Sequence, residues 1–176
     1  MNELVIKTKI TSELEEREMN DLITLKQQHW GYSVEEHKNW LADNIYPDDN
    51  HMLIYRGGGV LLAYLNAVNV DVSINQSMYR MLGIGNVCVD KDNAHAGVGS
   101  ILMACINAFI KKADSIGILL CKEPLINFYE HSGWQIIRSQ SSFVNGQLFS
   151  HTIMNFDPNH KYIKEDASLI EVSRNF

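Results

Sequence analysis

The sequence predicts a mixed α/β fold in which a central, mostly antiparallel sheet of about six to seven strands is flanked by about four helices. An alternating strand and two amphipathic helices come first, three strand-like runs joined by tight turns follow, and a strand–helix–strand unit comes after them. Because two strands joined by a helix run in the same direction, two strands near the centre of the sheet are expected to be parallel.

The N-terminal part predicts one strand and two helices. Residues 3–10 alternate apolar and polar side chains, which is typical of a strand. Residues 11–30 carry an apolar stripe at helical spacing, and acidic residues in the first turn suit the helix dipole. Residues 33–45 predict the second helix, because Ser33 and Glu36 have the spacing of a capping box.

The next part predicts an antiparallel meander. Its three strand-like runs are residues 51–56, 60–73 and 78–90, and glycine or Asn-Gln turns separate them. Gly83 and Gly85 lie inside the last run. A glycine weakens a strand, so these positions indicate a bulge or a close approach by another part of the backbone.

The remaining elements are a helix, a buried strand, a short helix and two late strands around the Asn145-Gly146 turn. They are predicted at residues 97–114, 117–122, 123–133, 134–139 and 147–156. Residues 1–156 are expected to form a single domain. Residues 157–176 have a mixed pattern and predict a tail that packs on this domain or on a partner subunit, or a frayed end.

Composition excludes several classes of function. The net charge of −6 and the lack of a Lys/Arg run argue against nucleic-acid binding. No apolar run has the length of a membrane span, and the N-terminus lacks the layout of a signal peptide, so we expect a cytoplasmic protein without a membrane partner. Cys88, Cys105 and Cys121 lie in apolar contexts without a C-x-x-C pair and are expected to be reduced.

Common catalytic and nucleotide-binding motifs are absent from the sequence. There is no Walker loop, no third glycine after either Gly-x-Gly pair, no G-x-S-x-G elbow and no H-E-x-x-H. The seven histidines are scattered along the chain, so we expect no metal site.

The glycine turn before the helix at 97–114 is the first candidate site. A helix that begins directly after a strand leaves its first backbone N–H groups unpaired. Glycines at 97 and 99 would let the backbone at residues 96–100 approach a ligand, and the helix dipole adds partial positive charge, which suits a pyrophosphate. The alternative is a plain strand-to-helix turn whose glycines have only a steric role.

Tyr129 is the second candidate. It lies on the short helix after the next strand, near the carboxyl ends of the two parallel strands, where ligands of open α/β sheets bind. Its hydroxyl could donate a proton to a leaving group. The alternative is an aromatic side chain that packs beside Phe128.

Together these two segments resemble the GNAT acyltransferase superfamily. Its pyrophosphate loop, Arg/Gln-x-x-Gly-x-Gly/Ala, corresponds to residues 94–99, and its later aromatic-Tyr and Gly-aromatic pairs correspond to Phe128-Tyr129 and Gly133-Trp134. The resemblance covers about residues 3–156, and the order of elements agrees with it. One position departs from the pattern, because Ala94 stands where the family has Arg or Gln, so a side-chain contact to the cofactor is missing.

The resemblance implies a sheet splayed between its two central parallel strands, acetyl-CoA as co-substrate without a metal, and direct attack by an amine on the thioester. It implies that His95 and the residues 96–100 hold the pyrophosphate, and that Tyr129 protonates the leaving thiolate. The residues implied in cofactor binding are Val87, Cys88, Val89, His95, Ala96, Gly97, Val98, Gly99, Ser100 and Tyr129.

Other roles are less specific. The backbone of residues 87–89 would pair with the pantetheine arm like an added strand. The Cys88 side chain is interpreted as a packing residue, since no His or Lys pairs with it in sequence. Asp90 is a candidate general base, with a cap at the strand end as the alternative. Trp30 and Tyr32 could line the acceptor pocket or belong to the core.

Three functions remain open from the sequence. The leading one is an N-acetyltransferase that moves an acetyl group to a primary amine of an unidentified small molecule or protein, with a small-molecule or peptide amine as partner and a homodimer as a possible assembly. A catalytically silent coenzyme-A-binding module is the second, because of Ala94. The third is a structural or dimerising protein without a cofactor.

Overall fold

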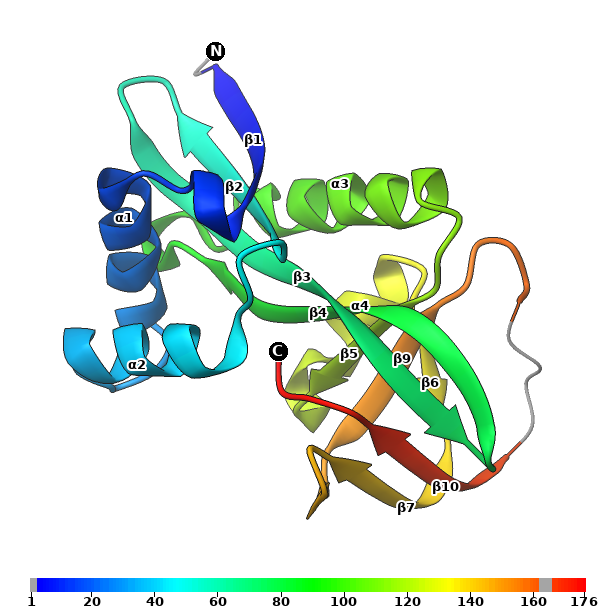
Figure 1. Ribbon diagram of the computed structural model, residues 1–176. Helices are drawn as coiled ribbons and strands as arrows, with labels where there is room; N and C mark the ends of the chain where they lie inside the picture. The colour runs from blue at the N-terminus through cyan, green and yellow to red at the C-terminus, as the bar shows by residue number, and fades with distance from the viewer. Residues whose placement is uncertain (1–2, 162–165) are drawn as a thin grey trace. The chain divides into compact units, whose positions relative to one another are not determined.

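The computed structural model describes residues 3–161 and 166–176 of the 176-residue chain (Figure 1). By their internal contacts these residues form two compact units. The first contains the chain up to Val68, the segment Gly85–Met103 and Phe176, and the second contains Asn69–Ile84 and Ala104–Asn175. Three elements have residues in both units, namely β3 (Val60–Ile74), β4 (Ser77–Val89) and α3 (Val98–Lys112).

The first unit is built on an antiparallel arrangement of β1, β2 and the first half of β3. β1 (Leu4–Ile10) pairs with β2 (Asn50–Arg56) from Leu4↔Arg56 to Ile10↔Asn50. β2 pairs with β3 from Asn50↔Ala67 to Arg56↔Val60. Every residue from Leu61 to Val68 of β3 is buried, as expected for a central strand with both faces covered.

Two helices pack side by side in this unit (Figure 1). α1 (Glu16–Gln27) follows a 3₁₀ turn, η1 (Thr11–Glu13), and buries Leu22, Ile23 and Leu25. α2 (Val34–Asn44) begins at the predicted capping box. The Glu36 N–H donates to Ser33 Oγ at 3.2 Å, and the Ser33 N–H donates to the Glu36 carboxylate at 2.8 Å.

The second unit contains most of the strands. Its further elements are β5 (Gly117–Cys121), η3 (Glu123–Leu125), α4 (Ile126–His131), β6 (Gln135–Ile137), β7 (Ser139–Val144), β8 (Gln147–Leu148), β9 (Thr152–Phe156) and β10 (Ala167–Val172). β9 pairs antiparallel with both β5 and β6, and β7 pairs with β8 across the predicted Asn145-Gly146 turn.

The parallel pair expected from the strand–helix–strand unit is β4 and β5. They pair over Leu82↔Gly117, Gly83↔Ile118 and Ile84↔Leu119. The pairing with β5 ends there, although β4 continues to Val89. The splay implied by the resemblance stays a prediction.

Residues 167–172 were placed in a C-terminal tail by their sequence pattern. In the structure they form β10, which pairs antiparallel with β3 and parallel with β7. This segment is therefore part of the sheet of the second unit. The single domain drawn at residues 1–156, and the partner subunit proposed for the tail, stay predictions.

The α4 corner of the second unit is fixed by aromatic packing. Gly133 ends α4 with a positive φ of 86°, and the next residue, Trp134, is buried. The Trp134 indole N–H donates to Asn107 Oδ1 at 3.0 Å. A Cβ at Gly117 would lie 2.6 Å from the Trp134 ring, so only glycine lets β5 pass this close to the ring.

The observed architecture confirms the predicted mixed α/β fold with a mixed, mostly antiparallel sheet and four α-helices among the described residues. These residues contain ten strands, more than the predicted six to seven, because short strands such as β8 have no periodic pattern of their own. None of the described helices is long and apolar enough to cross a membrane.

Candidate functional site

The loop before α3 leaves a helix N-terminus open. Gly97 has a positive φ of 77°, and nothing lies within 4 Å of where its Cβ would stand. Its carbonyl accepts the first helical hydrogen bond, from the Ile101 N–H at 3.1 Å. Ala94, His95 and Ala96 are exposed beside it.

The backbone N–H groups of residues 98–100 stand in the first turn of α3, where they have no partner within the helix. A left-handed glycine at the start of a helix, with these donors open and the helix dipole behind them, can hold an anion. The left-handed Gly97 turn expected before the helix is observed, and pyrophosphate binding by this loop stays a prediction.

The end of β4 next to this loop is irregular. Asn86 has a positive φ of 52°, and its side-chain amide donates to Asn66 Oδ1 on β3 at 2.6 Å. A Cβ at Gly85 would overlap the backbone of Phe176 and lie 3.3 Å from Asn66 Oδ1. The close backbone approach predicted at the β4 glycines is confirmed at Gly85.

Residues 87–89 continue β4 with different exposures. Val87 and Val89 are half-buried, and Cys88 is buried. Burial raises the pKa of the Cys88 thiol to about 12, although the positive charge of Lys26 acts in the opposite direction. A protonated, buried thiol is a poor nucleophile, which agrees with the interpretation of Cys88 as a packing residue.

Asp90 connects the end of β4 to α1. One carboxylate oxygen accepts from the Gln28 side-chain amide at 3.0 Å, and the other accepts from the Asn93 amide. Gln28 in turn accepts from the Lys91 N–H, and the His29 ring is 2.7 Å from the Val89 carbonyl. These side-chain contacts give Asp90 a structural role without a capping hydrogen bond, and they hold the end of α1 against the end of β4.

A buried lysine lies one turn earlier on α1. Lys26 is only 2% exposed, and its ammonium lies 4.5 Å from the centroid of the Trp40 ring and 5.8 Å from that of Trp30. No carboxylate of the described residues forms an ion pair with it. Burial lowers the pKa of Lys26 to about 8.

The predicted acceptor residues lie around this lysine. Trp30 is half-buried, whereas Tyr32 is 58% exposed and contacts the His37 ring edge-on with centroids 5.7 Å apart. His37, on α2, is buried, and its Nε2 has no hydrogen-bond partner. Burial first, and then the charge of Lys26, lowers the pKa of His37.

His51 on β2 links the side chains of Tyr64 and Thr11. Its Nδ1 is 2.8 Å from the Tyr64 hydroxyl, and its Nε2 is 2.8 Å from the Thr11 hydroxyl. Burial first, and the charge of Lys26 second, lowers the pKa of His51 to about 4, so the ring is neutral at pH 7. A cavity of about 230 Å³ beside it is lined mainly by apolar residues of α1 and α2.

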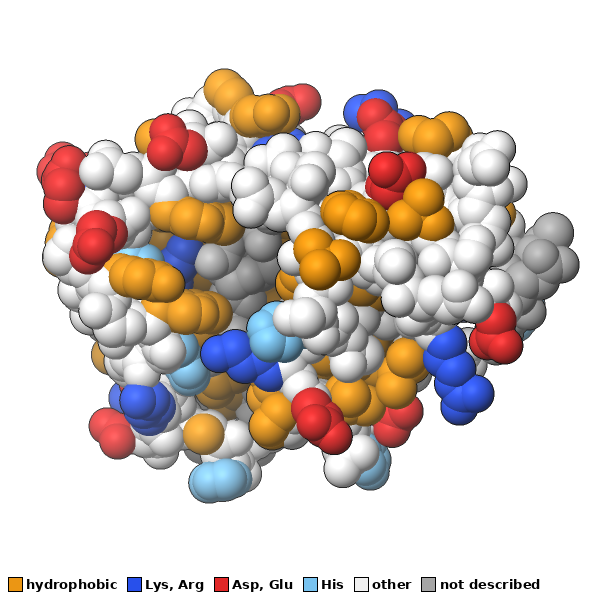
Figure 2. Space-filling view, turned by 90° about the horizontal axis from the view of Figure 1, so that it is seen from below, with side chains coloured by type: hydrophobic (Ala, Val, Ile, Leu, Met, Phe, Trp, Pro, Cys, Tyr) orange, Lys and Arg blue, Asp and Glu red, His pale blue; other side chains and the backbone are white. Residues whose placement is uncertain are grey.

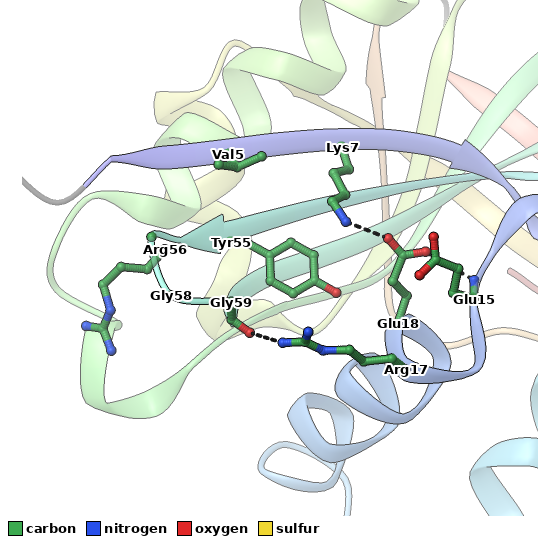
Figure 3. A pocket seen from close by; sticks show the side chains of 10 residues that line it. Val5, Lys7, Glu15, Arg17, Glu18, Tyr55, Arg56, Gly58 and Gly59 are labelled. Atoms are coloured by element: carbon green, nitrogen blue, oxygen red, sulfur yellow. Dashed lines mark hydrogen bonds and ion pairs between the residues drawn. The ribbon is translucent and has the colours of Figure 1, made fainter.

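A second cavity, of about 220 Å³, lies between β1, β2 and α1 (Figure 3). Several charged groups in and beside it are paired within the protein. Lys7 and Lys9 donate to Glu18 at 2.8 and 2.7 Å, and Arg17 donates to the Gly59 carbonyl at 3.4 Å. The charges around Glu18 are therefore paired with one another, whereas Arg56 also lines the cavity (Figure 3).

Tyr129 lies in the second unit, on α4. It is 5% exposed, and its ring contacts Phe128 edge-on with centroids 5.0 Å apart. Its carbonyl accepts from the Ser132 and Trp134 N–H groups, which tie the Gly133 corner to the helix. The packing beside Phe128 is thus observed, and a catalytic role for the hydroxyl stays a prediction.

Sequence reasoning missed the buried donors near α1. Lys26 falls on the apolar stripe of the helix, four residues after Leu22, and this position was the available signal. The open nitrogens of His37 and Asn66 had no such signal, because their burial depends on how the helices cover the sheet.

On the face drawn in Figure 2, acidic and basic side chains are interspersed, without a continuous basic area. The groups of His, Cys, Asp and Glu in the part of the chain that the structure describes include none arranged to hold a metal ion.

The chain matches one family model and is similar to several solved structures. Residues 11–137 match the family model described as an acetyltransferase (GNAT) domain. A search of curated proteins found no significant match. Among solved structures, Escherichia coli ElaA has a TM-score of 0.63 at 19% identity, covering 87% of this chain and 99% of that chain.

Two further structures hold the cofactor of their family. A GNAT family N-acetyltransferase, YhbS from Escherichia coli, in complex with CoA, has a TM-score of 0.65 at 11% identity, over 97% of this chain and 90% of that chain. A GNAT family acetyltransferase from Brucella melitensis, in complex with acetyl-CoA, has a TM-score of 0.61 at 14% identity, over 95% and 96%. At these identities the structural likeness establishes the fold.

Proposed function

The chain belongs to the GNAT acetyltransferase family, and from that premise we propose that it transfers an acetyl group from acetyl-CoA to a primary amine of a small molecule or protein. The observation that carries the proposal is the open N-terminus of α3. Gly97 is left-handed, its Cβ position is vacant, and the next backbone N–H groups belong to the first turn of the helix, where they have no intrahelical partner. A pyrophosphate fits such a cradle without a lysine.

The cofactor would supply an activated thioester, and the chain's own residues would bind and orient it. Residues 96–100, with His95 beside them, would hold the pyrophosphate. Residues 87–89 of β4, beyond the end of its pairing with β5, would offer backbone groups to the pantetheine arm. YhbS and the Brucella melitensis protein, which share the fold, are structures with CoA or acetyl-CoA, and this supports the assignment.

Catalysis would depend mainly on holding the amine and the thioester together. The neutral amine nitrogen forms a bond to the carbonyl carbon and loses one proton to a base or to water, the carbon–sulfur bond breaks, and the thiolate accepts a proton. We assign that proton donation to the Tyr129 hydroxyl. Asp90 stays a candidate general base, but both its oxygens already accept from amides, which supports a positioning role for it.

The silent coenzyme-A-binding module is the second candidate, and Ala94 favours it, since this exposed residue adds no side-chain contact to the loop. Binding without turnover of any amine would identify that function. The cytoplasmic location, the homodimer, the absence of a metal and of nucleic-acid or membrane partners, and the amine nature of the acceptor also stay predictions.

The test compares two glycines that share a backbone conformation. Gly97 and Gly146 have φ of 77° and 73°, and both have open space at the Cβ position, but Gly146 lies in the β7–β8 turn. The Gly97→Val and Gly146→Val variants therefore have similar backbone strain, of about 1–2 kcal/mol each. Only the first fills the proposed cradle.

Saturating acetyl-CoA, at about 100 times its dissociation constant, should stabilise wild type and Gly146→Val by about 2.7 kcal/mol, a rise in melting temperature of about 5–10 °C. Gly97→Val should show little rise. Release of free thiol in an amine screen then distinguishes the enzyme from the binding module. No rise for wild type at millimolar acetyl-CoA, or an equal rise for Gly97→Val, would contradict the proposed cradle.

A further inference from the structure

Lys26 is a buried cation without a counter-ion. It is 2% exposed, and the described residues form no ion pair with it. The faces of Trp40 and Trp30 lie near its ammonium and offset part of the lost hydration. Buried charges in proteins are nearly always paired, so an uncompensated one is expected to meet its anion when a ligand binds.

Two further buried side-chain nitrogens in the same unit have no hydrogen-bond partner. These are Nε2 of His37 on α2 and Nδ2 of Asn66 on β3. The charge of Lys26 acts on His37 and on His51, and His51 stands directly opposite Asn66 in the β2–β3 pairing. Of these groups, the Lys26 ammonium and the Asn66 amide can donate to an anion, whereas the neutral His37 ring donates its N–H to the Trp30 backbone and leaves Nε2 as an acceptor.

Lys26 lies near residues 87–89, the part of β4 that is proposed to bind the pantetheine arm. The charge of Lys26 acts on the Cys88 thiol, which lies between Val87 and Val89. One turn after Lys26, the His29 ring contacts the Val89 carbonyl, and Gln28 contacts Asp90. The lysine is thus held near the residues 87–89 by the same helix end that contacts them.

We propose that the amine accepted by this protein also carries a carboxylate, and that the buried ammonium of Lys26 binds this carboxylate. The inference rests on the proposed function, because it names the class of its acceptor: amino acids and related amino carboxylates. A singly charged carboxylate matches the single cation, since His51 is neutral and the Cys88 thiol is protonated. A phosphate dianion would leave one negative charge buried without compensation.

The first experiment measures anion binding without acetyl-CoA. Acetate and 4-aminobutyrate are added at about 50 mM, at pH 7, to wild type, Lys26→Met and the control Lys111→Met, which changes an exposed lysine on α3. Relative to sodium chloride of equal ionic strength, the carboxylates should raise the melting temperature of wild type and Lys111→Met by about 2–5 °C. Lys26→Met should lose this rise.

The second experiment measures acetyl transfer. The standard α-amino acids and 4-aminobutyrate are compared with their carboxamides, which keep the amine and remove the charge. For the preferred acceptor, kcat/KM with wild type should favour the acid over its amide by at least about tenfold. In Lys26→Met this ratio should fall to within about twofold, mainly through a higher KM, while Lys111→Met keeps it.

The outcomes separate this inference from the proposed function. Equal rates with acids and amides in wild type, or an unchanged preference in Lys26→Met, would overturn the carboxylate site while the acetyltransferase stands. If no amine is acetylated, the melting experiment still decides about the anion site. A larger rise with inorganic phosphate than with acetate, or equal rises in wild type and Lys26→Met, would also overturn the assignment.

Discussion

Helix α1 carries two buried charged side chains, of which one has ion-pair partners and the other has none among the described residues. Glu18 and Lys26 are each 2% exposed and lie about two turns apart. Glu18 accepts from Lys7 at 2.8 Å and from Lys9 at 2.7 Å, with a further hydrogen bond from the Glu15 N–H (Figure 3). Lys26 has two aromatic rings beside it and no ion pair among the described residues.

The difference separates a structural charge from one available to a ligand. A buried carboxylate with two lysines and a backbone donor needs no further partner. A buried ammonium without an anion destabilises the free protein. Such a charge therefore indicates a role other than stability. Position on the same helix and equal burial therefore do not imply the same role.

Removal of the compensated charge should have the largest effect. Glu18→Gln leaves Lys7 and Lys9 without their shared anion, and we expect a loss of about 2 kcal/mol in the free energy of unfolding. The expected loss is below the usual range for buried pairs because both lysine side chains are partly exposed, at 42% and 23%. Chemical denaturation checks this value, with the exposed Glu16→Gln as the control on the same turn.

The pKa of Glu18 also predicts how the stability of the protein changes at acid pH. Burial would raise the pKa of Glu18, but the hydrogen bonds from Lys7 and Lys9 lower it from 4.5 to about 2. A depressed carboxyl pKa stabilises the fold above its unfolded value, so this contribution is complete above pH 4.5 and is lost as the pH falls towards 2. An acid unfolding profile that is the same for Glu18→Gln and wild type would show that the network is not stabilising.

The uncompensated charge should respond in the opposite direction. Lys26→Met keeps the apolar stem of the side chain and removes the charge, so the free protein should gain about 1 kcal/mol. Burial lowers the pKa of Lys26 from 10.5 to about 8, and the unfolded chain therefore binds more protons between these two values. The advantage of the variant should be greatest below pH 8 and should shrink as the pH rises towards 10.5.

The difference in melting temperature between Lys26→Met and wild type, measured from pH 7 to pH 10, is the readout. It cancels the other groups that titrate in this range. A variant that is less stable than wild type at pH 7 would show that Lys26 already has sufficient compensation within the fold, and it would remove the contrast with Glu18.

The same contrast shows what sequence could predict. The capping box of Ser33 and Glu36, the parallel pairing of β4 with β5 and the close approach at Gly85 follow from local patterns, and the structure confirms them. The open turn at Gly97 was predicted as a ligand cradle because strand, glycine and helix are adjacent in the chain. These features are set within a few residues of each other, where sequence spacing carries the information.

The features that sequence could not predict depend on distant partners. Lys7, Lys9 and Glu18 come together only because β1 lies beside α1, and Asn66 meets Asn86 only across two strands. β10 was interpreted as a tail, because its partner strands β3 and β7 are far away in the sequence. Whether a buried charge is paired is a property of these contacts, so a charged residue on an apolar stripe indicates burial and not its compensation.

The smallest effect concerns the aromatic rings beside Lys26. If Trp40 supplies part of the missing compensation, Trp40→Leu should destabilise wild type more than it destabilises Lys26→Met. A double-mutant cycle should give a coupling of about 0.5–1 kcal/mol for this pair at pH 7.

Trp30 is the matched control, since its ring is 5.8 Å from the ammonium against 4.5 Å for Trp40, and its coupling should be smaller. The coupling with Trp40 should fall as the pH approaches 10, because a neutral amine has no charge for the ring to attract. A coupling that does not change with pH would come from packing alone. It would show that the Trp40 ring does not compensate the charge of Lys26.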